Sequence, residues 1–403
     1  MRASTDRILT TQSGSLPRPD HLIELNRARE QEGVDDTELR RATDTAVAEV
    51  VRRQRDTGLD VVGDGEQGKT MSRRVNFGSW WLYSFGRLGG LETAQTSLTE
   101  IRPRGGEPGE VQLSSFGERR DRELFADAYN DPDSGVSTGA QGSVFPVCRG
   151  PLTYTGHEAV RADIASFRAA LDDAGLDEGF MTAIAPGSCS RIGNEHYDTD
   201  DEFLHACAEA MREEYREIID AGLILQLDDP CIAENWDQIN PEPTVENYRR
   251  FTMRRVEALN YAIRDLPQDR IRFHLCWGSW HGPHTTDIPM RDIVDVMLAV
   301  NAGAYVFEAG NVRHEHEWKV WRDVELPSDK IIMPGVVSHA TNVVEHPELV
   351  ADRIVRFAEG VGRERVVATT DCGLGGRIHP QIAWAKLGAL AEGAELATRR
   401  LWP

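Results

Sequence analysis

Short runs of apolar and β-branched residues recur along the chain, and most are separated by longer stretches of helical period. In 208–222, for example, Met211, Tyr215, Ile218 and Ile219 fall on one helical face at spacings of three and four. Strand and helix in alternation predict a parallel sheet, and eight repeats predict a closed (β/α)8 TIM barrel. The eight runs are 7–13, 59–65, 179–186, 223–230, 271–278, 304–310, 330–337 and 365–373.

One barrel domain accounts for residues 1–403, except for an irregular stretch at 76–160 that is rich in Gly, Pro and Arg. We interpret 76–160 as a long insertion after the second strand, which either covers the barrel mouth or makes contacts between subunits of a homo-oligomer. A doubly wound open sheet is the alternative fold, but no GxGxxG follows the first strand.

Composition narrows the class of protein. With 40% hydrophobic and 28% charged residues the chain is typical of a globular protein, and the net charge of −21 argues against a nucleic-acid partner or an anionic membrane surface. The sequence has no apolar run of the roughly 18–20 residues that a membrane span needs, and its N-terminus lacks the apolar segment of a signal peptide. We therefore expect a cytoplasmic protein whose six scattered cysteines are reduced thiols.

Polar residues collect where the predicted strands end, which is where TIM barrels carry their active sites. They are Ser15, Glu66, Ser188, Asp228, Asp229, His274, Cys276, Glu308, Ser338, His339, Asp371 and Cys372.

The strand IRFHLCWG (271–278) holds a pair of metal-ligand side chains. A period of two puts His274 and Cys276 on one face, so the pair can chelate one ion, and Zn²⁺ prefers nitrogen and sulfur ligands in a tetrahedron. Glu308 and Cys372, at the ends of later strands, are the candidates for the remaining ligands. The alternative is that these are buried cysteines and strand-end polar residues that hold no metal.

Several of these segments together resemble the cobalamin-independent methionine synthases, specifically their catalytic C-terminal barrel and its single-barrel relatives. The resemblance covers most of 5–75 and 175–395 and implies a zinc site made by His274, Cys276, Glu308 and Cys372. We find no resemblance for 76–160. The segments are HLC (274–276), FEAG (307–310), TDCGLGG (370–376), QSGSLPRP (12–19), DVVGDGEQGK (60–69), LQLDDP (225–230) and HPQIAWAKL (379–387).

The resemblance implies an enzyme that binds a small thiol on Zn²⁺ as a thiolate and transfers a methyl or alkyl group from a donor to its sulfur. For a homocysteine-like thiol, Glu66 and Asp228 would hold the ammonium, and backbone N–H groups around Gly14 and Ser15 would hold the carboxylate. Arg73 could grip an anionic tail.

One segment departs from the pattern of the family. Single-barrel relatives tend to have Asp-Val-Lys-Thr after strand seven, where this chain has SHAT (338–341). The added His339 could protonate a leaving group, so His339 and Asp228 are the candidate catalytic residues; a surface or structural role for His339 is the alternative.

Two other functions stay open. The first is the opening of an epoxide by a thiol such as coenzyme M, as in the epoxyalkane:coenzyme M transferases, and the second is a zinc-binding scaffold without catalysis. Retention of both Glu66 and Asp228 favours the amino-acid thiol over coenzyme M.

Overall fold

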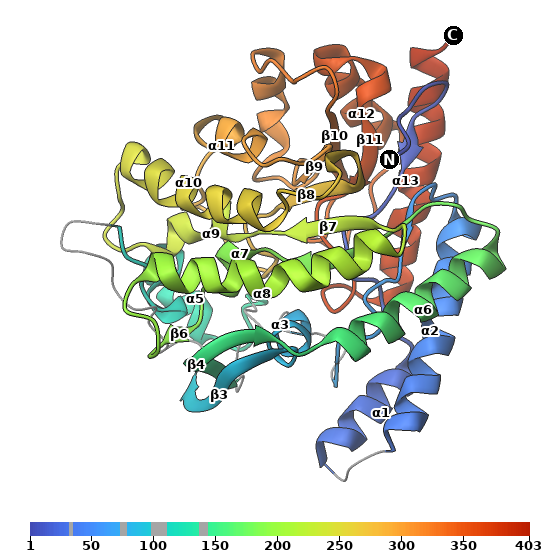
Figure 1. The fold of residues 1–403 in the computed structure, drawn as a ribbon. Coiled ribbons are helices and arrows are strands. Elements are labelled where there is room, and N and C mark those ends of the chain that lie inside the picture. The colour runs from blue at the N-terminus through green and yellow to red at the C-terminus, as the bar shows by residue number, and fades with distance from the viewer. Residues whose placement is uncertain (32–34, 73–78, 98–110, 137–143) are drawn as a thin grey trace.

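The computed structural model describes residues 1–31, 35–72, 79–97, 111–136 and 144–403, and its centre is a barrel of eight parallel strands (Figure 1). Each neighbouring pair is parallel, and a bridge between Thr11 and Val61 joins the first strand to the second and closes the ring. Each predicted run contains one strand, so the predicted (β/α)8 barrel is confirmed. The strands are β1 (Leu9–Thr10), β2 (Val62–Gly63), β5 (Gly179–Ile184), β7 (Ile224–Asp228), β8 (Ile271–Leu275), β9 (Ala304–Phe307), β10 (Ile331–Val337) and β11 (Val367–Thr370).

Helices between successive strands cover the outside of the barrel (Figure 1). One of them, α8, begins at a capping box in which Thr199 and Glu202 bond each other's backbone N–H, and it buries Met211, Tyr215 and Ile218 as the period predicts. No helix among the described residues is long and apolar enough to cross a membrane. The helices are α1 (Asp20–Gln31), α2 (Asp36–Thr57), α6 (His157–Ala174), α7 (Pro186–Cys189), α8 (Asp200–Asp220), α9 (Cys231–Gln238), α10 (Val245–Ala262), α11 (Val294–Leu298), η4 (Glu315–Arg322), α12 (Pro347–Val361) and α13 (Pro380–Leu401).

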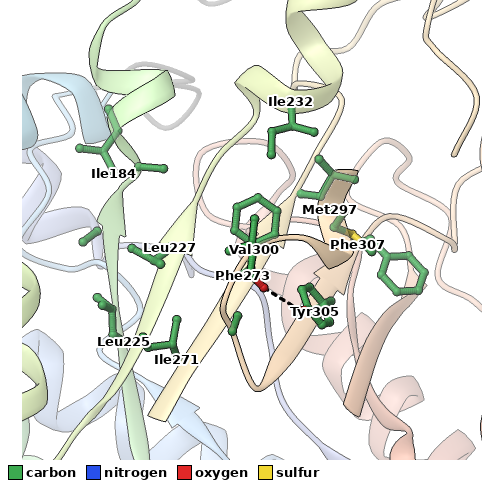
Figure 2. Packing of buried hydrophobic residues seen from close by; sticks show 14 of the residues in the cluster. Ile184, Leu225, Leu227, Ile232, Ile271, Phe273, Met297, Val300, Tyr305 and Phe307 are labelled. Atoms are coloured by element: carbon green, nitrogen blue, oxygen red, sulfur yellow. Dashed lines mark hydrogen bonds between the residues drawn. The ribbon is translucent and has the colours of Figure 1, made fainter. Parts of the chain in front are cut away.

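The two faces of each strand have different neighbours because successive side chains point to opposite sides. Leu225, Leu227 and Phe273 belong to the apolar core between sheet and helices (Figure 2). The alternate residues face into the barrel, where the Arg272 guanidinium, from β8, donates to Gln226 Oε1 (2.7 Å) and, across the barrel, to the Gln12 carbonyl (2.7 Å). This network ties β8 to β7 and to the β1 segment below the barrel mouth.

An additional layer precedes α6 (Figure 1). Its strands pair as β3–β4–β6, antiparallel between β3 and β4. Arg87, next to β3, forms ion pairs with Asp163 of α6 and Glu214 of α8, which fasten the layer to the barrel. Its elements are α3 (Ser79–Phe85), β3 (Leu88–Ser97), η1 (Phe116–Glu118), α4 (Arg120–Leu124), α5 (Ala126–Asn130), β4 (Val144–Tyr154) and, after β5, β6 (Gly193–Asn194).

Candidate functional site

Three metal-ligand side chains meet at the C-terminal mouth of the barrel. His274 ends β8, Cys276 follows it directly, and Cys372 lies just after β11. One ligand atom from each lies within 4.8 Å of the other two, and all three residues are buried. His274 Nε2 has no hydrogen-bond partner, although it is shielded from solvent. A buried imidazole nitrogen without a partner, beside two sulfurs, fits a cation with nitrogen and sulfur ligands.

Asp228, at the end of β7, orients the His274 ring. Nδ1 of the ring donates to Asp228 Oδ1 at 2.9 Å, and Gln226 Nε2 donates to the same oxygen at 2.6 Å. Burial disfavours the imidazolium, but the hydrogen bond and charge of Asp228 outweigh it and raise the pKa of His274 to about 9. Carboxylates that hold the second nitrogen of a metal-binding histidine are common, so Asp228 has a positioning role that the sequence did not suggest.

A hydrogen bond between the two cysteines shifts their pKa values in opposite directions. A hydrogen bond from the Cys276 thiol, acting against burial, lowers the pKa of Cys372 to about 6. The same hydrogen bond, with burial, raises the pKa of Cys276 well above its usual value. One sulfur is therefore ready to bind a cation near neutral pH, and the other must first lose a proton.

Glu308, the fourth predicted metal ligand, lies outside the group of three. Its carboxylate accepts from the Trp277 N–H (2.9 Å) and from Asn311 Nδ2 (2.8 Å), and it falls in a second buried group with His339 and Asp371. Burial, with the neighbouring charges of Asp371 and Cys372, raises the pKa of Glu308 to about 8 despite His314. The structure thus holds this carboxylate on neighbouring N–H groups, and its role as a metal ligand stays a prediction.

His339, the predicted proton donor, lies in the second buried group with Glu308 and Asp371. It is buried, it does not line the cleft described below, and burial together with the charge of Arg377 lowers its pKa well below the usual value. A neutral imidazole in that position is poorly suited to donate a proton to a leaving group. Arg73, the predicted grip for an anionic tail, lies outside the described residues.

A cleft lies above the three ligand residues, and Gly14, Ser15, Glu66 and Asp228 line it. The Gly14 N–H is already used, because it donates to Gln12 Oε1 at 2.5 Å. The φ of Gly14 is +146°, and a Cβ there would come within 3.2 Å of Glu66 Oε1, so glycine is required beside that carboxylate.

The sequence analysis did not predict two charged residues of the site, Lys69 beside Glu66 and Arg377 beside Ser15. Lys69 Nζ lies 3.1 Å from Glu66 Oε1, which also accepts from the Thr182 hydroxyl at 2.9 Å. Despite burial, Lys69 and Arg18 lower the pKa of Glu66, which keeps it ionised. Arg377 lines the cleft and donates to the hydroxyls of Ser15 (3.1 Å) and Ser279.

The outer wall of the cleft comes from the additional layer. Phe116, Arg119, Arg122 and Tyr129, which we call the roof, line the cleft together with barrel residues such as Trp280. No periodicity or ligand pattern in 111–136 pointed to this role. These four side chains line the cleft, whereas the predicted roles of 76–160, covering the mouth or making contacts between subunits, stay predictions.

Fold and site together define a class: a closed β/α barrel with an imidazole and two thiols converging at its C-terminal mouth. A model of the cobalamin-independent synthase catalytic domain matches residues 144–395. The chain therefore belongs to the cobalamin-independent synthase family, through its catalytic domain, as the resemblance indicated.

The sequence identity to individual relatives is low. The chain is 27% identical over 236 residues to a 2-hydroxypropyl-CoM lyase of Xanthobacter autotrophicus and 24% identical over 215 residues to a methionine synthase of Saccharolobus solfataricus. These alignments cover 51% and 52% of the chain and 57% and 54% of the relatives, so the chain spans about half the length of the curated relatives it matches.

The solved structure of a B12-independent methionine synthase from Shewanella sp. W3-18-1, in complex with selenomethionine, has a similar fold. The TM-score is 0.69 at 19% identity, over 98% of this chain and 99% of that one. At this identity the likeness concerns the fold.

Proposed function

We propose that the protein is a zinc-dependent thiol S-alkyltransferase whose acceptor is a homocysteine-like amino-acid thiol. The observation that carries the proposal is the convergence of His274, Cys276 and Cys372 at the floor of a cleft. A donor set of one imidazole and two thiolates suits Zn²⁺, and three protein ligands leave a fourth position for a substrate. When bound there, Zn²⁺ would lower the pKa of the substrate thiol so that its sulfur is a nucleophile near neutral pH.

The charged lining of the cleft supports an amino-acid thiol. Glu66 and Asp228 offer carboxylate oxygens for an ammonium group, and Arg377 with the Ser15 hydroxyl offers donors for a carboxylate. Opposite charges on two sides of one cleft fit a zwitterion. Binding both ends of the substrate fixes where its sulfur lies relative to the donor.

The reaction forms one bond and breaks one. The sulfur lone pair attacks the alkyl carbon of the donor, a carbon–sulfur bond forms, and the bond from that carbon to its leaving atom breaks with its electron pair. The leaving atom then takes a proton, and the products are a thioether and the dealkylated donor. The residues of the cleft orient the thiol, and the roof limits the access of water.

Opening of an epoxide by a coenzyme M-like thiol is the second candidate. Lys69 neutralises Glu66 at 3.1 Å, which makes that carboxylate a weaker partner for an ammonium group. Arg377 suits a sulfonate as well as a carboxylate. The 2-hydroxypropyl-CoM lyase among the relatives is consistent with this acceptor.

Isothermal titration of zinc-loaded and metal-free protein separates these functions. We expect homocysteine to bind the zinc-loaded protein more tightly than homoserine, the matched ligand with oxygen in place of sulfur, and to lose that advantage without metal. Tighter binding of 2-mercaptoethanesulfonate than of homocysteine would favour the second candidate. Equal binding of homocysteine and homoserine, with or without zinc, would overturn thiol activation.

A further inference from the structure

Four ionisable side chains form a hydrogen-bonded chain between the loop after β8 and η4. His284 Nδ1 and His314 Nε2 each lie 3.1 Å from the same oxygen of Asp287, Oδ2. His314 Nδ1 lies 2.8 Å from Glu317 Oε2. We call these four residues the clip. They do not line the cleft, and the proposed function gives them no role.

The partners of the two rings define their charge. A neutral imidazole has one N–H group and one lone pair, so only one of its nitrogens can donate. In His284, Nε2 faces the Trp280 carbonyl at 3.1 Å, and Nδ1 faces Asp287. In His314 both nitrogens face carboxylates. Although burial opposes it, the two imidazoles lower the pKa of Asp287, which therefore stays an acceptor. Each ring thus donates twice and carries a positive charge.

The cost of burying these two charges is offset by their carboxylate partners. Although burial acts against it, Asp287 raises the pKa of His284 to about 9. Asp287 and Glu317 together raise the pKa of His314 to about 10, again against burial. Buried charges persist when they are paired in this way. The other charged or titratable groups around the clip are Glu308, Asp121, Arg313, Arg119 and His281.

One end of the clip supports a wall of the cleft. Trp280 lines the cleft, and its ring centre lies 4.1 Å from that of His284. The Arg119 guanidinium lies 4.3 Å from the same ring centre. A Cβ at Gly278 or Gly282 would collide with the Trp280 ring, so the loop folds closely around it. The orientation of the ring therefore depends on its neighbours in this loop, and His284 is one of them.

The backbone of His284 has an uncommon conformation. Its φ is +55°, in the left-handed region that residues with a side chain rarely adopt. Such a conformation persists where the surrounding contacts fix it, and here both ring nitrogens are bonded. The next N–H group, that of Thr285, donates to Asp121 of α4 at 3.0 Å. The loop is thus anchored at His284.

The other end of the clip borders Glu308. The Trp277 ring, whose backbone N–H donates to Glu308, stacks on the His314 ring with their centres 4.1 Å apart. The Asn311 side chain accepts from the His314 N–H at 3.0 Å and donates to Glu308. The clip therefore lies between the Trp280 wall and the groups that hold Glu308.

We propose that the clip is a positioning element of the cleft: with both imidazoles charged it fixes the Trp280 wall, and Asp287 is its central residue. One oxygen of Asp287 joins the two rings, so a neutral side chain there leaves both charges without that partner. The Trp280 ring then loses the support of His284. This role goes beyond the proposed function, because it concerns the shape of the cleft for any ligand.

The charge state is tested by ¹H–¹⁵N NMR of protein labelled in its histidine nitrogens, at pH 8, where an ordinary histidine with a pKa of about 6.5 is neutral. We expect His284 and His314 each to show two nitrogens of the N–H type; His284→Gln and His314→Gln assign the signals. In Asp287→Asn the titration midpoint of His284 should fall from about 9 toward roughly 6.5. A neutral ring at pH 8 for either residue of the wild type would overturn the proposal.

The wall is tested by ¹⁹F NMR of protein labelled with 5-fluorotryptophan, in which Trp280→Phe assigns the Trp280 signal. Asp287→Asn should shift or broaden that signal. Glu317→Gln should change it less, because Glu317 contacts one imidazole and Asp287 contacts both. Asp292→Asn is the control, since it removes a nearby carboxylate whose partner, Arg291, lies outside the clip. An unchanged Trp280 signal in Asp287→Asn, or an equal change in the control, would contradict the positioning role.

Circular dichroism shows whether each variant folds. A purely structural role would lower the melting temperature of Asp287→Asn and leave the Trp280 signal of the folded variant in place. If Asp287→Asn does not fold, the Trp280 signal of Glu317→Gln and the wild-type charge state decide. Two imidazoliums with a changed signal support the clip, and a neutral ring or an unchanged signal overturns it.

Discussion

Replacing Asp228 with alanine should weaken zinc binding while leaving the three ligand side chains in place. Asp228 accepts the hydrogen bond of His274 Nδ1 at 2.9 Å and so sets the direction of Nε2 toward the metal position. Loss of such a partner typically costs about 10- to 100-fold in metal affinity, or roughly 1.4–2.7 kcal/mol. Because the Asp228 side chain is 28% exposed, water can replace part of the lost oxygen, and we expect the lower half of that range.

The measurement is a competition for Zn²⁺ between the protein and a chromophoric chelator at pH 7. Asp228→Asn keeps an oxygen that can accept from His274 and should lose less affinity than alanine. Glu66→Gln is the matched control, since it also removes a carboxylate from the cleft but leaves His274 untouched. It should keep the zinc affinity and weaken homocysteine by about tenfold, the lower end for a charge-assisted hydrogen bond, because Lys69 already neutralises part of the Glu66 charge.

Unchanged zinc affinity in Asp228→Ala would refute the role of Asp228 in orienting His274. Binding of the substrate ammonium group would then be its one remaining proposed role. An equal loss of zinc in Glu66→Gln would mean that the effect is a general one of charge in the cleft. Thermal unfolding of each variant shows whether a loss of metal is instead a loss of fold.

Other measurements test the ligands and the charges around them. Cys276→Ser and Cys372→Ser should each lose zinc by elemental analysis yet keep the circular dichroism of a folded barrel, because the metal does not hold so large a core together; full zinc retention in both would contradict the site. Zinc binding at pH 7 should release about two protons, from His274 and Cys276, and the affinity should rise with pH through about 9 and beyond, because the pKa of the Cys276 thiol is raised above its usual value. Calorimetry in buffers of different ionisation enthalpy counts the protons, and a count near zero would contradict this. Although burial opposes it, Arg191 and Arg119 lower the pKa of Glu234 to about 2. The ionised Glu234 therefore contributes about 3 kcal/mol to folding stability above pH 4.5, and this contribution is lost as pH falls toward 2. The melting temperature should fall less steeply with decreasing pH in Glu234→Gln than in the wild type, and an unchanged slope would disprove the contribution.

The barrel could be predicted from sequence because each strand is short, apolar and followed by a polar residue at the same edge. The period of two in 271–276 was enough to place His274 and Cys276 on one side. Partners such as Cys372 come from strands that lie far apart in the chain. Closure of the sheet by the Thr11–Val61 bridge brings those strand ends to one mouth.

The hydrogen-bond partners of these strand-end residues could not be predicted from the sequence. Whether Asp228 meets an ammonium group or the His274 ring depends on the parallel register of β7 and β8, which pairs these two residues directly. Glu308 likewise ends its strand as expected, but the Trp277 N–H and Asn311 hold its carboxylate apart from the group of three. Which partner each carboxylate contacts depends on shifts of a few ångströms, and these are set by neighbours that are distant in sequence.

The position of the roof could not be predicted from the sequence for a different reason. Its residues lie in short helices and loops without a period, and their positions are set by ion pairs such as Arg119–Glu234, whose two members are 115 residues apart. Since this pair holds the roof while His274, Cys276 and Cys372 lie at strand ends, the roof and the floor of the cleft are held in place by different contacts. Substitutions at Arg122 or Tyr129 should then leave His274 and the cysteines in place, so the zinc affinity should stay unchanged across variants of the roof.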